Sequence, residues 1–465
     1  MVNKKKIHFE ISERKILLRI FDVFSVLLVL YIVGISFNFR YFSISTTNFY
    51  WTIVLGFYIN VIGTVFEMYN LQVASSQFQV IKSSILTASL TVLVYLLTPL
   101  YTPILPSNRL QILFFFLAVL LALLGWRMIY VHFLASGRFI KKVVLICDRD
   151  QVEELVKGLE DADPHYKVMG YINSDSIHQS DKPIADFVKN IDTNKLESFV
   201  VENSVSEVVI ASQKTDGISA RIYNQLIHLL ESGYIIREYT QVYESITQRI
   251  PVQYVAEDFY RYFPFSRSNQ NHLYLLVVRI IEIVLSLWGC MLTVVLLPLI
   301  LIGNLLGNRG RLFYTQERVG KNGEVFKILK FRTMVKNAEK DGAVFTTTND
   351  SRITAFGKFL RKTRIDEFPQ FINILKGEMG VIGPRPERPV FVNEIAEVMP
   401  FYETRHVIKP GLTGWAQVNY SYGETIDDSL IKLQYDLYYI KHRSIFLDIN
   451  IVFKTFSTIL FYRGQ

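Results

Sequence analysis

The sequence is poor in the residues that several common protein classes depend on. It contains only two cysteines, Cys147 and Cys290, which are far apart and show no CxxC or Cys/His zinc spacing. This argues against a disulfide framework and a zinc site, so we interpret both as packing residues. Helix-turn-helix, zinc-finger and aromatic-rich RNA-binding motifs are also missing, and we therefore expect no nucleic-acid partner.

Apolar residues and positive charge are abundant instead. The 465 residues are 50% hydrophobic and carry a formal net charge of +8. Residues 304–465 hold 24 Lys and Arg against 17 Asp and Glu, which places +7 of that charge in the last third of the chain. A basic balance of this kind suits lipid headgroups or nucleotide phosphates.

Four apolar segments open the chain, at about 16–37, 49–68, 83–104 and 110–134. Each is close to the ~20 residues that cross a bilayer as a helix, and the first lacks a signal-peptide cleavage site. Cations cluster before and at the start of the first segment, and at and after the end of the fourth: Lys4, Lys5, Lys6, Arg14, Lys15, Arg19, Arg127, Arg138, Lys141 and Lys142. The two outer loops offer only Arg40 and Arg109. The positive-inside rule then predicts a four-span transmembrane bundle over residues 1–140 with both ends in the cytoplasm.

Residues 141–262 change character. Short buried strands are predicted at 141–147, 166–172 and 207–211, and amphipathic helices at 148–160 and 219–232. Strands alternating with helices indicate a cytoplasmic parallel α/β domain of Rossmann-like type. Its first turn, CDRDQVEE, has no glycine, so the phosphate-binding fingerprint is absent. We therefore favour a degenerate nucleotide-binding-like domain with a structural or regulatory role.

The apolar segment 273–307 is long enough to cross the membrane, but three features favour a re-entrant helix. Both flanks are basic, with Arg261, Arg267, Arg309, Arg311 and Arg318. Pro298 interrupts the helix, and Arg279 with Glu282 would be costly at mid-bilayer. The alternative, an ordinary fifth span, would place the basic last domain outside, against the charge rule.

Two adjacent carboxylates, Asp366 and Glu367, lie in the stretch RIDEFPQFINILKGEMGVIGPRPE. Pro369 suits the start of a helix that ends at Gly377, and a helix N-terminus attracts phosphate. The surrounding cations are Arg361, Lys362, Arg364 and Arg385, the last held between two prolines. An aspartate can attack phosphorus and a neighbouring carboxylate can hold Mg²⁺. The alternative is a surface acid pair at a helix cap, balanced by Arg364.

Three other segments add to this picture. QERVGKNGEVFKILKFRTM predicts a hairpin turning at Lys321-Asn322-Gly323, with Lys330 and Arg332 on one face. HVIKPGLTGWAQVNY is a Gly/Pro-punctuated loop that carries Lys409. Residues 427–444 and 447–463 are amphipathic, and their aromatic stripes suit lipid contact or core packing equally.

The blocks KFRTM, RIDEFPQFINILKGEMGVIGPRPE and KPGLTGWAQVNY resemble the signature blocks of the bacterial sugar transferases. These are monotopic polyprenyl-phosphate phosphoglycosyl transferases, and the four spans with the α/β domain resemble their large subclass. Residues 266–465 would form the mainly helical catalytic domain. Departures are Phe368 and Phe371 in place of leucines, Arg311 in place of a proline, and Leu297 before Pro298.

The resemblance implies transfer of a hexose-1-phosphate from a UDP-hexose to undecaprenyl phosphate, with release of UMP. Asp366 matches the family's nucleophile and Glu367 matches its partner. Mg²⁺ would be the cofactor, with Asp366 and Glu367 as its ligands. Substrate-binding cations would be Lys330, Arg332, Arg361, Arg364, Arg385 and Lys409. The enzyme would lie in the bacterial inner membrane with its catalytic domain on the cytoplasmic face, and would initiate exopolysaccharide, capsule or O-antigen synthesis.

Two other functions fit less well. A flippase would need more spans and more polar residues within them. A non-catalytic membrane scaffold for polysaccharide assembly fits the first half of the chain but leaves the carboxylate and arginine blocks without a role. No residue identifies the hexose, the pathway or the oligomeric state. A homo-oligomer is compatible with the sequence.

Overall fold

The structure is a computed structural model. It describes residues 11–37, 39, 41–42, 44, 48–69, 74, 77–99, 101–134, 140–163, 166–174, 188–211, 218–252, 271–308, 310–336, 338, 350–399, 401–420 and 425–460. The chain divides into two compact units, residues 1–247 and 248–465. The predicted boundary at 262–266 lies outside the described residues, as do the flanking cations Lys4, Lys5, Lys6, Arg40, Arg138, Arg261, Arg267 and Arg309.

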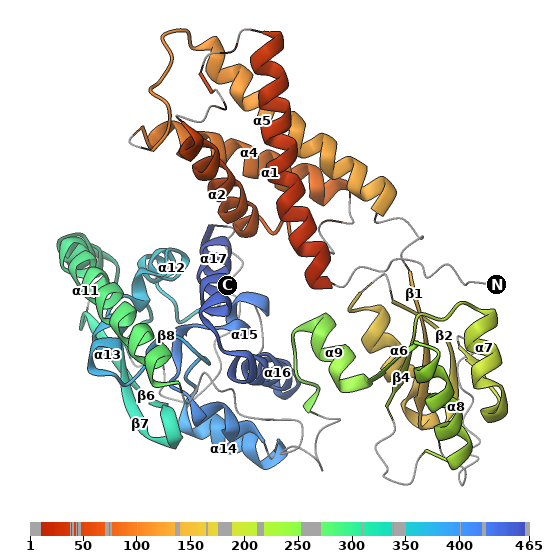
Figure 1. The fold of residues 1–465 in the computed structure, drawn as a ribbon. Helices are drawn as coiled ribbons and strands as arrows, with labels where there is room; N and C mark the ends of the chain where they lie inside the picture. The colour runs from red at the N-terminus through yellow and green to blue at the C-terminus, as the bar shows by residue number, and fades with distance from the viewer. Residues whose placement is uncertain are drawn as a thin grey trace. The chain divides into compact units, whose positions relative to one another are not determined.

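The first unit begins with a bundle of apolar helices (Figure 1). They are α1 (Ile11–Ser36), α2 (Phe49–Val65), α4 (Gln77–Leu97) and α5 (Leu110–Ile129), which continues as a π-helical turn, Tyr130–Leu134. Three of them are long and apolar enough to cross a membrane, while α2 is shorter at 17 residues. The chain is therefore a membrane protein, although α2 falls short of the predicted span 49–68.

A buried ion pair joins α1 to α5 within this bundle. Arg127 donates from Nε and Nη2 to the two carboxylate oxygens of Asp22, at 2.9 and 2.5 Å. A third donor of Arg127 reaches the carbonyl of Met68 at 2.7 Å. Charged groups in apolar surroundings need such partners, so the pair fixes the register of the two helices.

The α/β part of the first unit is a five-stranded parallel sheet in the order β3-β2-β1-β4-β5. The strands are β1 (Lys141–Cys147), β2 (Tyr166–Asn173), β3 (Lys189–Asn190), β4 (Glu207–Ile210) and β5 (Ile235–Glu238). The helices are α6 (Val152–Glu160), α7 (Leu196–Glu202), α8 (Ala220–Glu231) and α9 (Tyr239–Thr247). The three predicted strands are confirmed within one residue. Helix α8 is also confirmed within one residue at each end, and α6 begins four residues later than predicted. Elements β3, α7, β5 and α9 were not predicted.

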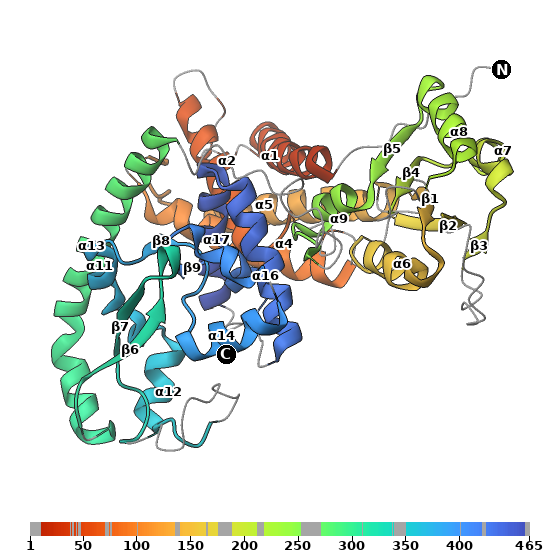
Figure 2. The ribbon, with the colours of Figure 1, turned by 90° about the horizontal axis from the view of Figure 1, so that it is seen from below.

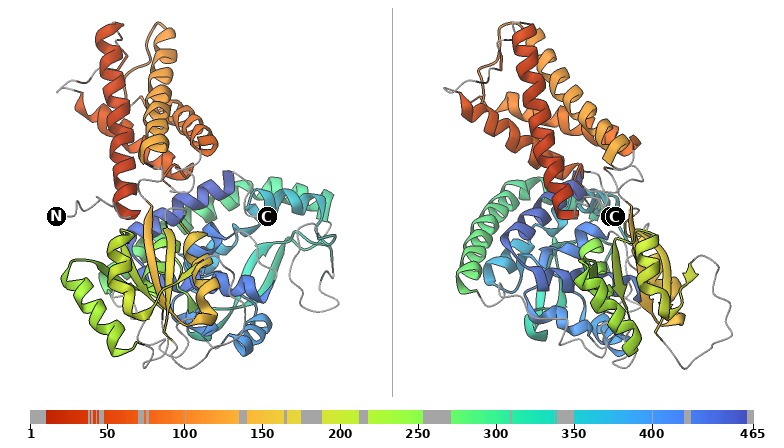
Figure 3. Two further views of the ribbon diagram at one scale, coloured as in Figure 1. Left: turned by 90° about the vertical axis from the view of Figure 1, so that its right-hand side faces the viewer. Right: turned by 45° about the vertical axis from the view of Figure 1, so that its right-hand side comes forward.

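Helices lie on both faces of this sheet (Figure 3). Val144 and Ile146, alternate residues of the central strand β1, share a core with Leu196 of α7 and Leu226 of α8. The sheet is thus buried on both sides, which explains why its strands are almost continuously apolar.

The second unit combines helices with two small sheets (Figure 2). Its helices are α11 (His272–Gly303), α12 (Ala355–Lys362), α13 (Gln370–Lys376), α14 (Pro389–Val398), α15 (Trp415–Asn419), α16 (Ile426–His442) and α17 (Ile445–Leu460). Strands β6 (Phe313–Val319) and β7 (Val325–Phe331) pair antiparallel, and β8 (Gly380–Ile382) pairs parallel with β9 (Gly411–Thr413). The predicted hairpin is confirmed, and Asn322 and Gly323 supply the positive φ angles of its turn.

Helix α11 contacts the rest of its unit along most of its length. Near its start, the Tyr274 hydroxyl donates to Asp448 Oδ2 at 2.5 Å. In its middle, Gly289 packs so closely against Phe371 that an added Cβ would lie 2.2 Å from the ring. Beyond its end, a Cβ added at Gly307 would lie 2.7 Å from Phe356. Pro298, which the sequence predicted to interrupt the helix, lies within α11, and the helix continues beyond it to Gly303 and into a π-helical turn, Asn304–Asn308.

The main core of the second unit gathers around Trp415. It includes Leu433, Leu437 and Ile440 of α16, together with Ile250 and Val252 from the start of the unit. The apolar stripe of α16 is therefore core. Helix α17 differs, because its side chains Phe446, Ile449 and Phe456 are exposed although Ile451 is buried.

Candidate active site

The two adjacent carboxylates lie in a tight turn between α12 and α13. Arg364 adopts a left-handed conformation, with φ 58°, and turns the chain into a short 3₁₀ segment, Ile365–Glu367. Pro369 then caps α13, which begins one residue later than predicted, and Gly377 ends it at φ 85° as predicted. Arg364 has a Cβ, so its left-handed conformation is strained. This strained residue lies two positions before Asp366.

Three cations surround one of the two carboxylates. Lys330 Nζ lies 3.2 Å from Glu367 Oε1, Arg385 Nη2 lies 3.5 Å and Arg364 Nη1 lies 3.9 Å from the same oxygen. Burial alone would raise the pKa of Glu367, but the three cations outweigh burial and hold it below its usual range. Glu367 is therefore a fixed negative charge that organises the basic side chains.

Asp366 has the opposite environment. Its side chain is buried, and Oδ1 has no hydrogen-bond partner among the described residues. Burial and the neighbouring charge of Glu367 raise the pKa of Asp366 to about 6. Two adjacent carboxyl groups with pKa values pushed in opposite directions are typical of sites where each group has a different chemical role.

The β6–β7 hairpin brings Lys330 to this turn because Asn373 of α13 binds the edge of β7. The Asn373 amide donates to the carbonyl of Lys327 at 2.8 Å and accepts from the N–H of Leu329 at 3.0 Å. Glu378 accepts from the same amide nitrogen at 2.6 Å. A side chain thus completes the strand's hydrogen bonding and fixes the hairpin against α13.

The predicted substrate-binding cations fall into two groups. Lys330, Arg364 and Arg385 contact Glu367, and Arg361 donates to Thr333 Oγ1 at 3.0 Å while its charge acts on Asp366. The other two lie elsewhere. Arg332 donates to the carbonyl of Asn308 at 3.0 Å, and Lys409 lies by Gly377 at the C-terminal end of α13, beside Arg279.

Helix α13 has only seven residues. The predicted attraction of its N-terminus for phosphate is therefore small beside that of the cations, because a short helix sums few peptide dipoles. Burial lowers the pKa of Lys330, with Glu367 opposing that shift. The positive charge of the site is held in a partly dehydrated environment, where it acts more strongly on an anion than in water.

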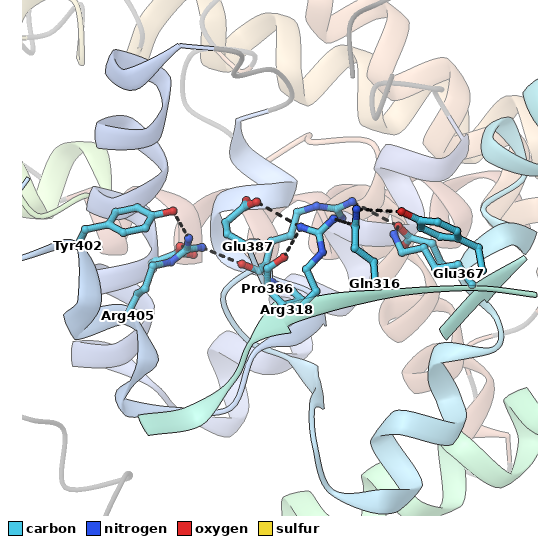
Figure 4. A network of polar contacts seen from close by, with 11 residues as sticks. Gln316, Arg318, Glu367, Pro386, Glu387, Tyr402 and Arg405 are labelled. Atoms are coloured by element: carbon cyan, nitrogen blue, oxygen red, sulfur yellow. Dashed lines mark hydrogen bonds and ion pairs between the residues drawn. The ribbon is translucent and has the colours of Figure 1, made fainter. Parts of the chain in front are cut away.

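A polar network that sequence reasoning missed continues from the carboxylate turn (Figure 4). On β6, Gln316 donates to the Tyr314 hydroxyl at 3.0 Å and accepts from Arg318 at 2.7 Å. The spacing of Tyr314, Gln316 and Arg318 at every second residue was a readable signal, because such residues share one face of a strand. Arg405 and Asp436 form an ion pair at 2.7 Å. No sequence pattern predicts this pair, because 31 residues separate the two along the chain.

Comparisons with known proteins agree with the signature blocks. A family model described as bacterial sugar transferase matches residues 273–462. An Aeromonas hydrophila UDP-N-acetylgalactosamine-undecaprenyl-phosphate N-acetylgalactosaminephosphotransferase is 36% identical over 254 residues, which cover 55% of this chain and 59% of that protein. The UDP-glucose:undecaprenyl-phosphate glucose-1-phosphate transferase of Escherichia coli K12 is 41% identical over 185 residues, 39% of each chain. The matched regions thus span less than two thirds of these two relatives.

A third relative is covered more fully. It is a Bacillus subtilis protein, provisionally named an undecaprenyl-phosphate N-acetylgalactosaminyl 1-phosphate transferase. This chain is 43% identical to it over 141 residues, which cover 30% of this chain and 79% of that protein. The similarity includes most of that shorter protein. The chain belongs to the bacterial sugar transferase family.

Proposed function

We propose that this protein transfers a hexose-1-phosphate from a UDP-hexose to undecaprenyl phosphate and releases UMP. The single observation that carries the proposal is the contrast between Asp366, whose Oδ1 has no partner in the described part of the chain, and Glu367, held by three cations. The relatives are named for transfer of N-acetylgalactosamine phosphate or glucose phosphate to undecaprenyl phosphate, which supports the reaction class. Because those sugars differ, the hexose has to be found by a screen of UDP-sugars.

The reaction proceeds in two displacements. A carboxylate oxygen of Asp366 attacks the phosphorus that bears the sugar, the bond to the UMP oxygen breaks, and a phosphosugar–aspartate ester remains. An oxygen of undecaprenyl phosphate then attacks the same phosphorus and displaces the carboxylate, which gives the sugar-linked lipid diphosphate. Two anionic substrates repel each other, and a covalent intermediate lets each be handled in turn. Lys330, Arg361 and Arg385 face the phosphates as the negative charge moves.

A divalent cation fits the donor set. The described residues contain no group of three or more His, Cys, Asp or Glu side chains arranged for a metal. Mg²⁺ commonly binds one or two carboxylates and completes its shell with water and substrate phosphates. The free Oδ1 of Asp366, with Glu367 beside it, suits such an ion. When bound, Mg²⁺ would neutralise charge on the transferring phosphate.

The packing of α11 supports one membrane arrangement. Its contacts with the rest of the second unit extend from Tyr274 to Gly307, a length of about 50 Å at the usual helical rise. Its other faces carry exposed apolar side chains, among them Leu276, Trp288 and Val295. A helix crossing the ~30 Å hydrocarbon layer would hold its two ends on opposite sides. These contacts support a re-entrant helix, with the catalytic unit on the cytoplasmic face of the bacterial inner membrane.

The first step is tested without lipid. Purified protein mixed with a UDP-hexose alone should release UMP once per enzyme and gain the mass of one hexose phosphate. Asp366→Asn keeps the shape but removes the nucleophile, so turnover should fall by about 10³-fold or more and the adduct should vanish. Persistence of the adduct in Asp366→Asn, or a strict need for both substrates before any UMP appears, would replace this scheme with direct transfer.

With the lipid acceptor present, the same preparation should complete a ping-pong cycle. This would give polysaccharide synthesis its first lipid-linked sugar, for an exopolysaccharide, capsule or O-antigen. A non-catalytic scaffold would release no UMP from any UDP-hexose.

A further inference from the structure

The segment Pro384–Glu387 is held by a hydrogen bond at each of its four carbonyl groups. Two donors are backbone N–H groups, from Gly411 to Pro384 at 2.8 Å and from Val319 to Glu387 at 2.9 Å. The two carbonyls between them accept from guanidinium groups, those of Arg405 and Arg318. Prolines on both sides of Arg385 already restrict the backbone, so this segment has little freedom left.

Arg405 is one of the two guanidinium donors. It donates to the Arg385 carbonyl at 3.0 Å, to the Tyr402 hydroxyl at 2.5 Å and to Asp436 Oδ2 at 2.7 Å. Its side chain is 4% exposed and Asp436 is 1% exposed. A group this buried, with three protein acceptors, does not reach a substrate phosphate. Its contact with the site runs through the backbone of Arg385.

Arg318, on strand β6, holds the next carbonyl. It donates to Pro386 at 2.9 Å and lies 3.4 Å from the Glu387 carboxylate. Gln316 accepts from its other nitrogen at 2.7 Å. The planar fork of arginine suits several acceptors at fixed angles, and a lysine ammonium does not reproduce it.

The side chain of Arg385 is, by contrast, the accessible part of the segment. It is 39% exposed, and its Nη2 lies 3.5 Å from Glu367 Oε1. We propose that Arg405 and Arg318 are positioning residues, which form a clamp that holds the Arg385 backbone so that its guanidinium meets the diphosphate of the UDP-sugar. The proposal rests on the proposed function and deepens it. The clamp fixes the position of one phosphate-binding cation before substrate arrives, which reduces the entropy lost on binding.

The test is a double-mutant cycle in the full-length enzyme, read as UMP release with UDP-hexose and undecaprenyl phosphate. Arg405→Lys and, separately, the less buried Arg318→Lys should each lower kcat/KM for the UDP-hexose by about 10- to 100-fold. In an Arg385→Ala background, the same changes should cost less than about 2-fold, because the residue they position is gone. The KM for undecaprenyl phosphate in the second step should move less than that for the UDP-hexose.

Arg237→Lys is the matched control. Arg237 forms an ion pair with buried Glu207 in the α/β sheet and donates to the Tyr166 hydroxyl at 3.0 Å, far in sequence from the clamp. The change should leave kcat/KM within about 2-fold of wild type.

The outcomes distinguish failure of the clamp from failure of the proposed reaction. If the Lys substitutions cost as much in the Arg385→Ala background as in the wild type, they act through general stability and the clamp is wrong, while the proposed reaction stands. Loss of activity in Arg405→Lys with no loss in Arg318→Lys would likewise reject a clamp built from both residues. If wild-type protein releases no UMP from any UDP-hexose, the proposed function fails and the clamp falls with it.

Discussion

At the scale of single residues, the site separates two neighbouring carboxyl groups by their surroundings. Three cations lie near Glu367, whereas one oxygen of Asp366 has no hydrogen-bond partner among the residues that the structure describes. A buried carboxylate with a raised pKa lowers the stability of the folded state when it is ionised. The same feature that leaves Asp366 available to attack an electrophile is therefore a cost to the fold.

This cost predicts that Asp366→Asn stabilises the protein while it abolishes activity. The folded pKa of about 6 lies above the ordinary value of 3.8, so stability falls as pH rises through that window, by about 1–3 kcal/mol at neutral pH. Without divalent cations, Asp366→Asn should raise the melting temperature at pH 7.5 by several degrees. Glu367→Gln is the control and should lower it, because Lys330 loses its charge partner. A lower melting temperature for Asp366→Asn would contradict the destabilisation that we assign to this buried, ionised carboxylate.

The same pKa predicts the pH dependence of the first step. As the proposed nucleophile, Asp366 would have to be ionised to attack, so single-turnover UMP release without lipid should rise with pH, with a midpoint at about 6 at low Mg²⁺ concentration. Cation binding favours the ionised carboxylate, so higher Mg²⁺ should move the midpoint to lower pH. A rapid-quench series across pH 4.5–8 at two Mg²⁺ concentrations measures both effects. A midpoint that stays the same at both Mg²⁺ concentrations would show that Asp366 is not a metal ligand.

At the scale of elements, sequence reasoning succeeded where the signal was local. The strands β1, β2 and β4 follow from short apolar runs, the hairpin β6–β7 from alternation on both sides of a glycine turn, and the end of α13 from Gly377. The same alternation grouped Arg332 with Lys330, but Arg332 follows the end of β7 and turns to Asn308. Lys409 lies at the far end of α13 because the β8–β9 pairing, between segments about 30 residues apart, directs its loop there.

Helix α11 shows why local signals stop short. Arg279 and Glu282 looked like a charge problem for a membrane helix. In the structure Arg279 donates to the carbonyls of Ile374 and Leu375 at 2.7 and 2.8 Å, both in the last turn of α13, where helix carbonyls need partners from outside the helix. Glu282 lies 3.4 Å from Arg279. These charges face the protein, and no pattern within α11 alone contains that information.

Opposite ends of α11 should therefore label from the same side of the membrane. Single cysteines at Asn271 and Arg311, exposed positions just before and after the apolar segment, in a protein whose Cys147 and Cys290 are replaced by serine, are tested with a membrane-impermeant maleimide in right-side-out and inverted vesicles. Both positions should react only in inverted vesicles, because they flank a helix packed on one body. A cysteine at Tyr101, between α4 and α5, is the control for the outer side. Labelling of the two α11 sites from opposite sides would establish a fifth span.

At the scale of the whole molecule, the chain consists of two units that can be tested apart. Every residue assigned to phosphate chemistry lies in residues 248–465. The first unit contributes the apolar bundle and the α/β sheet, whose first turn has no glycine for a dinucleotide. The chemical step should therefore survive removal of the first unit, provided that the cut respects the core of the second.

The position of that cut is the last prediction. The sequence suggested a catalytic domain that begins at Ser266, but Ile250 and Val252 are buried in the core around Trp415. Trp415 Nε1 donates to the carbonyl of Gln248 at 3.2 Å, and Ile250 N–H donates to that of Gln434 at 3.1 Å. Loss of two buried aliphatic side chains costs about 3–6 kcal/mol, a large part of the 5–15 kcal/mol that holds a typical domain together.

A protein of residues 248–465 in detergent should therefore melt cooperatively and form the hexose-phosphate adduct at a rate near that of the full chain. Residues 266–465 should melt several degrees lower or aggregate. Ile250→Ala with Val252→Ala in the longer piece separates the causes, since it removes the same core groups without shortening the chain. Equal stability and activity of the two pieces would show that residues 248–265 add nothing to the catalytic unit. An inactive but cooperatively folded 248–465 would show that the first unit takes part in the chemistry.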